Sequence, residues 1–266
     1  MAIHPTAVVD PKAQIHPSVE IGPFSIIGPN VSIGENTVIG PHCFFDGNTT
    51  VGKNNRFSPF VSIGCPPQDL KFSGEKTNVK IGNNNNFREY VTVHLAEGEG
   101  NSTIVEDDNL LMAYVHIAHN CRVGSFNVFA NAATLGGHVH IGDRAVIGGF
   151  TGIHQFCHVG KMVMIGGKSK IVKDVPPFIK IDGNPARVIG LNSVGLRRNG
   201  VPRDQIEKLR TLFKLFFRSE YNVSQALEKF RQDGLDESSY VKDFLDFLST
   251  STRGVYKRIR VDSEKE

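Results

Sequence analysis

The chain has 266 residues, of which 39% are hydrophobic and 21% are charged, with 27 Gly and no Trp. This composition is typical of globular proteins and excludes an intrinsically disordered tail or a collagen-like fibre. The apolar runs are far shorter than the roughly 20 residues that span a bilayer, and no basic region followed by an apolar stretch opens the chain. We therefore expect no membrane span and a cytoplasmic location.

The formal net charge of +3 hides an uneven distribution. Residues 161–218 contain 13 Lys and Arg but only 4 Asp and Glu, so this basic region carries a local charge of +9. The small overall charge gives no reason to expect a nucleic-acid partner. The four cysteines are scattered without C-x-x-C spacing, which argues against a zinc site or a redox pair.

A hydrophobic residue recurs at every sixth position from Ile3 to Ile171. Of the 29 positions in this phase, only Asp69, Glu75 and Glu99 are neither aliphatic nor Phe. A helix has a period of 3.6 residues and a strand a period of 2, so neither alone explains six. Glycine often follows the apolar residue, which marks a recurring sharp bend. Three six-residue edges make one triangular coil, so the pattern predicts a mainly β protein, a left-handed parallel β-helix of hexapeptide repeats.

The domain organisation follows from where this repeat is interrupted and where it ends. Residues 65–78 and 94–103 break the repeat, which then resumes in register, so both segments are predicted to project as loops. The β-helix is predicted over residues 1–175. Residues 176–202 are rich in Pro and Gly and are predicted as a linker. Apolar residues at helical spacing then predict an α-helical C-terminal cap over residues 203–266.

A prism of this width is filled by its own side chains and leaves no room for a ligand inside. Its flat faces meet either water or other copies of the chain. We therefore expect a site between parallel prisms in a closed homotrimer, since three subunits match a triangular cross-section.

Polar residues converge at one corner of the predicted prism, because positions about one or two coils apart stack on one another: His116, His119, His138, His154 and Gln155. Histidines on a β-helix suggest a metal, since zinc binds histidine nitrogens. In the γ-class carbonic anhydrases, which share this fold, the second histidine ligand follows the first by two coils and the third comes five residues later. Here His119, His154 and His158 are 35 and then 4 residues apart, which turns the side chains to other faces. We expect no metal and no cofactor.

Six motifs taken together resemble one known family. They are H-I-A-H-N at 116–120, G-G-H at 136–138, H-Q-F at 154–156, Q-D-L-K at 68–71, G-N-P-A at 183–186 and S-T-R-G at 251–254. They are similar to the motifs of the acyl-carrier-protein-dependent UDP-N-acetylglucosamine O-acyltransferases, which perform the first step of lipid A biosynthesis. The similarity covers essentially the whole chain.

The resemblance implies transfer of an (R)-3-hydroxyacyl group from acyl carrier protein to the glucosamine 3-position of UDP-N-acetylglucosamine. By this match His119 is the general base, a role that suits histidine near neutral pH. The Gly137 backbone N–H is the oxyanion donor, since glycine lets a backbone amide approach the reacting carbonyl closely. The implied substrate-binding residues are His94, His116, His138, His154, Gln155, Asn192 and Arg198, together with Asp69 and Lys71, which would reach the site of a neighbouring subunit.

One position departs from the family pattern. Several members carry Asp directly after the catalytic histidine, whereas this chain has Asn120. An amide can fix the tautomer of the ring but offers no charge to stabilise the imidazolium. We therefore expect His119 to be a somewhat weaker base here.

Two further expectations concern the donor. Gly167 matches the position that sets acyl-chain length in the family, and Lys168 and Lys170 lie close enough in sequence to close the groove again. The basic region is expected to attract the acyl carrier protein, because such carriers are strongly acidic.

Other functions stay open at this point. The acceptor could be a 3-amino group on the same sugar, and the donor could be acetyl-CoA, as in other hexapeptide acetyltransferases. A structural or ice-binding β-helix would carry regular rows of Thr, which this sequence lacks. The sister N-acyltransferase carries a separate domain before its repeats, whereas here the repeat begins at Ile3.

Overall fold

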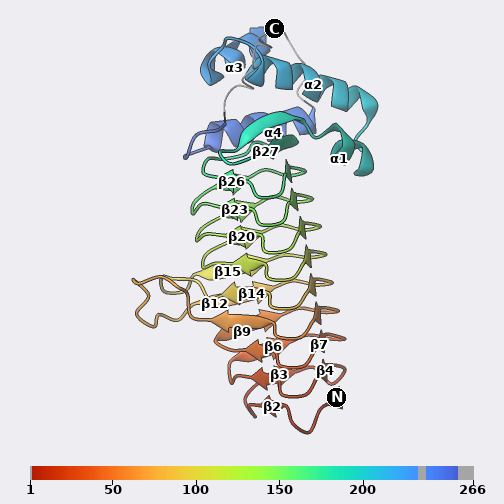
Figure 1. The fold of residues 1–266 in the computed structure, drawn as a ribbon, viewed down its shortest axis with the longest axis vertical. Coiled ribbons are helices and arrows are strands. Elements are labelled where there is room, and N and C mark those ends of the chain that lie inside the picture. Colours follow the sequence, from red (N-terminus) through yellow and green to blue (C-terminus); the bar gives the residue numbers. More distant parts are fainter. Residues whose placement is uncertain (1, 233–237, 257–266) are drawn as a thin grey trace.

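The computed structural model describes residues 2–232 and 238–256 of the chain. These residues form a tall prism of stacked coils with helices packed on the end opposite the N-terminus (Figure 1). Residues 233–237 and 257–266 of the expected helical cap lie outside the described part.

Three parallel sheets make the three faces of the prism, and the chain visits them in turn. Sheet A consists of β1 (Ala2–Ile3), β4 (Glu20–Ile21), β7 (Val38–Ile39), β10 (Arg56–Phe57), β13 (Asn86–Phe87), β16 (Leu110–Leu111), β19 (Val128–Phe129), β22 (Val146–Ile147), β25 (Met164–Ile165), β27 (Ile179–Asp182) and β28 (Arg187–Leu191). Sheet B consists of β2 (Val8–Val9), β5 (Ile26–Ile27), β8 (Phe44–Phe45), β11 (Ser62–Cys65), β14 (Thr92–His94), β17 (His116–Ile117), β20 (Thr134–Leu135), β23 (Gly152–Ile153) and β26 (Lys170–Ile171). Sheet C consists of β3 (Gln14–Ile15), β6 (Val31–Ile33), β9 (Asn48–Val51), β12 (Asn78–Ile81), β15 (Ser102–Val105), β18 (Arg122–Val123), β21 (His140–Ile141) and β24 (His158–Val159). The predicted parallel β-helix with a helical cap is confirmed.

The register explains how the repeat survives its two interruptions. Ile3 pairs with Ile21, a step of 18 residues. Across the first loop Ile63 pairs with Val93, a step of 30, and across the second Val93 pairs with Ile117, a step of 24. The first loop therefore adds the length of two hexapeptides and the second adds one, and the later apolar residues of the six-residue phase still point inward.

The interior is a column of aliphatic and Phe side chains, in which Phe45, Phe87 and Phe129 are fully buried. The corner between sheets C and A also buries a ladder of amides: Asn55, Asn85, Asn109 and Asn127. The side-chain oxygen of each accepts the backbone N–H of the equivalent residue one coil on, at 2.7–2.9 Å. Because buried backbone donors are costly unless paired, this ladder fixes the stacking of the coils.

Residues 176–202, which the sequence predicts as a linker, form regular structure. Strand β27 continues sheet A by pairing in parallel with β25, and β28 returns antiparallel to β27. The Gly and Pro of G-N-P-A belong to the turn of this hairpin, so the turn-rich composition marks a hairpin rather than a loose connection. Helix α1 (Ser193–Arg198) follows.

The cap contains α2 (Arg203–Phe217), α3 (Val223–Gln232) and α4 (Ser239–Thr250). Ring contacts join Phe213 to Phe217 within α2, and they join Phe216 and Phe217 to Phe244 of α4. The fully buried Asp174 ties the end of the cap to the prism, because its two oxygens accept the His158 N–H at 2.8 Å and the Ser251 hydroxyl at 2.7 Å. None of the helices in the described part of the chain is both long enough and apolar enough to cross a membrane.

Candidate active site

The corner between sheets B and C carries both projecting loops and the histidine motif. The first loop joins β11 to β12, the second joins β14 to β15, and both leave the prism on the same side (Figure 1). His119 lies in the turn that joins β17 to β18, at the same corner as the loops and one coil after the second loop. The site is therefore built where three consecutive coils meet two loops.

His119 is held in one orientation by its neighbour. It is only 8% exposed, and its Nδ1 lies 3.0 Å from the Asn120 side-chain oxygen. The orientation of that amide is itself fixed, because its oxygen accepts the Glu97 backbone N–H at 2.8 Å and its NH₂ donates to the Glu97 carbonyl at 3.1 Å. Since an amide oxygen only accepts, Nδ1 carries the proton and Nε2 keeps the lone pair that a general base needs.

Gly137 lies against the reactive edge of this ring. A Cβ built on Gly137 would come within 2.4 Å of both His119 Cε1 and His119 Nε2, so no side chain fits there. Among the described residues, the Gly137 backbone N–H donates no hydrogen bond. A basic nitrogen and an unused amide donor thus share one small space.

Glu97, on the second loop, is a member of the site that the sequence analysis missed. Its Oε1 accepts a hydrogen bond from His138 Nε2 at 2.9 Å and lies 3.9 Å from His119 Nδ1. His138 also stacks on Phe156, with ring centroids 4.5 Å apart. The acidic E-G-E of the second loop was a visible signal, but nothing in the sequence separates Glu97 from Glu99.

Glu97, His119 and His138 offer polar atoms within 4.8 Å of one another. These atoms already bond or face each other, with the Glu97 carboxylate engaged by His138. We therefore interpret the cluster as a hydrogen-bonded network that orients His119.

His116 and His94 line the same corner on sheet B, with ring centroids 4.8 Å apart. The Thr92 hydroxyl lies 2.7 Å from His116 Nδ1. Burial, followed by the nearby His94 and His119, lowers the pKa of His116 to about 4. Burial also lowers the pKa of His94. Both rings are therefore neutral at pH 7, and His94 Nδ1 is buried without a hydrogen-bond partner among the described residues.

Asp69 comes from the first loop to the reactive side of the base. Its Oδ2 lies 3.7 Å from His119 Nε2 of the same chain, whereas the sequence analysis placed it at a neighbouring subunit's site. Its other oxygen accepts the Lys71 backbone N–H at 2.8 Å, which is the main reason why its pKa is lowered. The Lys71 side chain is exposed.

Several other predicted site residues lie further away. His154 and Gln155 are exposed and lie one coil beyond Gly137, in the turn after β23. Gly167 and Lys168 lie at the corner between sheets A and B. Lys170 lies on sheet B, in the column of paired residues that runs from His116 through Thr134 and Gly152.

Asn192 and Arg198 lie at the two ends of helix α1, which packs at the corner between sheets C and A. The Asn192 amide caps this helix by accepting the Gly195 N–H at 3.1 Å, and it donates to the Met162 carbonyl at 2.9 Å. Met162 and Arg144 both lie at the corner between sheets C and A. The Arg144 guanidinium donates to the Asn199 side-chain oxygen at 3.3 Å. The structure therefore does not bring Arg198 to His119 within one chain.

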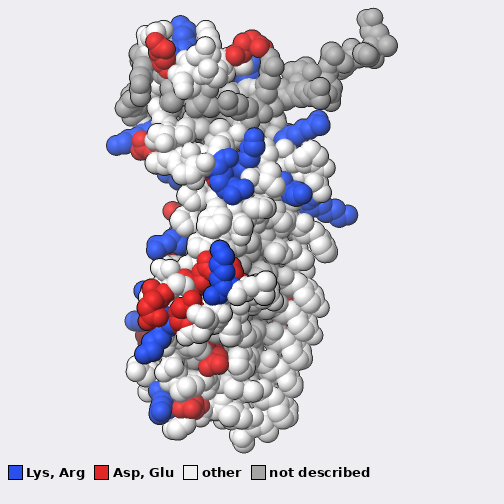
Figure 2. All heavy atoms as spheres, turned by 90° about the vertical axis from the view of Figure 1, so that its left-hand side faces the viewer, with Lys and Arg blue, Asp and Glu red and all other residues white. Residues whose placement is uncertain are grey.

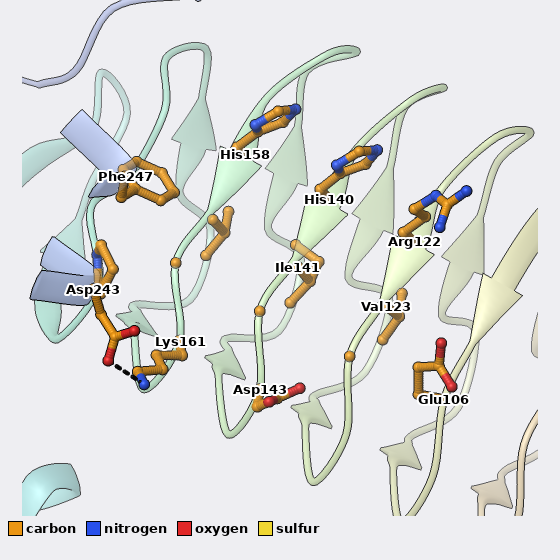
Figure 3. Close-up of a pocket in the computed structure, with 15 residues that line it drawn as sticks. Glu106, Arg122, Val123, His140, Ile141, Asp143, His158, Lys161, Asp243 and Phe247 are labelled. Carbon is orange, nitrogen blue, oxygen red and sulfur yellow. Dashed lines mark ion pairs between the residues drawn. The ribbon is translucent and has the colours of Figure 1, made fainter. Parts of the chain in front are cut away.

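A separate groove of about 450 Å³ runs along the outer face of sheet C to the cap (Figure 3). Arg122, His140 and His158 project from successive strands on one side of it, and the two histidine rings stack at 4.5 Å. Lys161 pairs with Asp243 of α4 at the end of the groove. None of the residues that line it belongs to the His119 cluster.

Comparisons with known proteins identify the family of the chain. Residues 174–256 match a family model described as UDP N-acetylglucosamine O-acyltransferase, domain 2. The acyl-[acyl-carrier-protein]–UDP-N-acetylglucosamine O-acyltransferase of Burkholderia mallei is 49% identical over 259 residues, which cover 96% of this chain and 99% of that protein. The acyl-[acyl-carrier-protein]–UDP-N-acetylglucosamine O-acyltransferase of Synechocystis is 46% identical over 211 residues, which cover 79% of this chain and 76% of that protein.

Solved structures match equally well. LpxA from Acinetobacter baumannii superimposes with a TM-score of 0.92 at 42% identity, covering 97% of this chain and all of that one. The UDP-N-acetylglucosamine acyltransferase of Bacteroides fragilis gives a TM-score of 0.93 at 37% identity, covering 96% of this chain and 99% of that one. The chain belongs to the acyl-[acyl-carrier-protein]–UDP-N-acetylglucosamine O-acyltransferase family.

Proposed function

We propose that the protein transfers an (R)-3-hydroxyacyl group from acyl carrier protein to the glucosamine 3-hydroxyl of UDP-N-acetylglucosamine. The observation that carries this proposal is the close approach of the His119 Nε2 edge to Gly137, which lies one coil further on. Acyl transfer to a hydroxyl needs a base and an oxyanion donor close together, and this corner supplies both.

In this mechanism His119 Nε2 removes the proton of the sugar hydroxyl as its oxygen attacks the thioester carbonyl. The carbonyl oxygen becomes an oxyanion and accepts the Gly137 N–H. Collapse of the tetrahedral intermediate forms the ester and breaks the C–S bond. The imidazolium returns its proton to the departing thiolate, so His119 ends neutral and ready for another turnover.

The proposal includes a homotrimer with sites between subunits. Its support is that Arg198 and His119 lie at different corners of one prism, so both can contact one substrate only if they come from adjacent chains. The corner between sheets A and B also exposes a ladder of stacked rings that another prism could cover: Phe24, His42, Phe60, Tyr90 and Tyr114.

Mixed trimers test this arrangement. His119→Ala and Arg198→Ala should each be nearly inactive alone, yet co-assembled at equal amounts they should regain about a quarter of the wild-type sites, each with both intact residues. A mixture as inactive as its parents, despite proven co-assembly, would place both residues in the same chain's site.

The charge distribution supports an acidic carrier protein as the donor. Lys and Arg gather on the coils below the cap, while Asp and Glu gather lower down around the projecting loops (Figure 2). A basic surface beside the site would steer an acidic carrier protein toward it. A carrier-protein donor also fits the cytoplasmic location expected from the sequence.

We place the acyl chain on the outer face of sheet B, along the column of paired residues that runs from His116 toward the cap. Gly152 leaves open space in this column, since a Cβ there would meet no atom within 4 Å. Lys170, one coil further on, and Gly167 with Lys168 at the adjoining corner would then limit the chain length.

The purified protein should be assayed with UDP-N-acetylglucosamine and 3-hydroxyacyl carrier proteins of several chain lengths. Mass spectrometry should detect the O-acylated sugar nucleotide, and the preferred chain length would emerge from the same assay. A 3-amino analogue of the sugar and acetyl-CoA serve as the competing acceptor and donor. Product only with either of these would replace the proposal.

A further inference from the structure

Glu97 and Asn120 form a reciprocal pair between the second loop and the prism. The Asn120 amide uses both ends on one residue, accepting the Glu97 N–H at 2.8 Å and donating to the Glu97 carbonyl at 3.1 Å. Asn120 has φ near 59°, a left-handed turn conformation that Asn tolerates well. This pair fixes the loop backbone so that the Glu97 carboxylate reaches His138 and the Nδ1 side of His119.

An aspartate side chain at position 120 would not fit this arrangement. A carboxylate could accept the Glu97 N–H, but it could not donate to the Glu97 carbonyl. It would also place a second negative charge close to the Glu97 carboxylate, and like charges at such range repel. Asn at position 120 and Glu at position 97 are therefore mutually suited.

Every charged or titratable group that faces His119 has a distinct place around the ring. Asp69 lies on the Nε2 side, where the acceptor hydroxyl must enter, at 3.7 Å. His138 meets the ring edge on, and His94 and His116 lie beyond it on sheet B. Glu97 is the one carboxylate on the Nδ1 side among the described residues, at 3.9 Å.

We propose that Glu97 is a positioning residue that supplies the negative charge behind His119, in place of the Asp that other family members carry after the catalytic histidine. This inference rests on the proposed role of His119 as the base. When Nε2 takes the hydroxyl proton, the imidazolium carries a positive charge that Glu97 stabilises through space. Its hydrogen bond to His138 holds the carboxylate in place for this task.

The test compares Glu97→Gln, Glu99→Gln and the double variant Glu97→Gln with Asn120→Asp. Glu97→Gln keeps an acceptor for His138 but removes the charge, so kcat should fall roughly 10- to 100-fold with little change in KM. Glu99→Gln removes a charge from the same loop, and its activity should stay within about twofold of wild type. The double variant restores a carboxylate next to Nδ1 through Asn120→Asp but loses the amide bond to the carbonyl of residue 97, so it should recover part of the lost kcat.

A second readout needs no turnover. Neutral imidazole reacts with diethyl pyrocarbonate, and mass spectrometry can follow modification of His119 against pH. Removing the Glu97 charge should shift the midpoint for His119 to lower pH, whereas a purely structural role would leave it unchanged.

The proposal is overturned if folded Glu97→Gln has wild-type kcat, or if its His119 midpoint is unshifted. A wild-type enzyme without activity on the proposed substrates, but with a His119 midpoint that depends on Glu97, would count against the proposed function alone.

Discussion

Gly137→Ala tests the geometry of the site with the smallest possible change. A methyl group on Gly137 would come within 2.4 Å of His119 Nε2 and Cε1, about 1 Å inside the 3.4 Å at which ordinary contact begins. Since His119 is fixed from behind by Asn120, the ring must turn or shift by about that amount. A displacement of this size can cost roughly 10²-fold in rate, and a disturbed oxyanion donor 10²- to 10³-fold.

We therefore expect kcat for Gly137→Ala to fall about 10²- to 10³-fold in the carrier-protein assay. Gly190→Ala is the matched control, because its new methyl group meets no atom within 4 Å and lies in β28, away from His119. Both variants should keep their assembly state in size-exclusion chromatography. If folded Gly137→Ala retained kcat within about threefold of wild type, Gly137 could not face the reacting atoms.

Three further predictions concern stability. The pKa of His116 is about 4 in the folded protein, against 6.5 ordinarily, so between these pH values the unfolded chain binds a proton that the folded chain does not. The free energy of unfolding should therefore fall by up to about 3 kcal/mol as pH drops from 6.5 to 4. Urea titrations across this range should show the loss, and His116→Gln should flatten it. Asn120→Ala removes two hydrogen bonds to the second loop, so proteolysis or hydrogen exchange should rise at 95–101 while the melting temperature changes little. Phe129→Ala empties a fully buried position and should cost about 3–5 kcal/mol in urea unfolding.

The repeat made most of the fold predictable, because a six-residue period constrains every inward side chain. Even the loops followed from it, since an insertion of whole hexapeptides leaves the phase intact. The hairpin of β27 and β28 was missed because its turn residues look the same as those of a linker. The local composition does not show that sheet A continues here. The parallel pairing of β27 with β25 in the structure does.

The sequence could predict those contacts of the site that depend only on the stacking of one coil on the next. Gly137 and His119 are one coil apart, so the repeat places them together. Glu97 was not predictable, because a loop outside the repeat sets its position. The separation of Arg198 from His119 also needed the structure, since it depends on which corner α1 packs against.

Acyl transfer to UDP-N-acetylglucosamine depends, in the proposed mechanism, on His119 as the base. The most direct measurement compares wild type and His119→Ala in the assay with 3-hydroxyacyl carrier protein, with melting temperature and assembly state recorded alongside. We predict that wild type yields the acylated sugar nucleotide and that the variant, equally folded, loses at least about 10²- to 10⁴-fold in kcat. A folded His119→Ala enzyme with near-normal kcat would show that His119 is not the base.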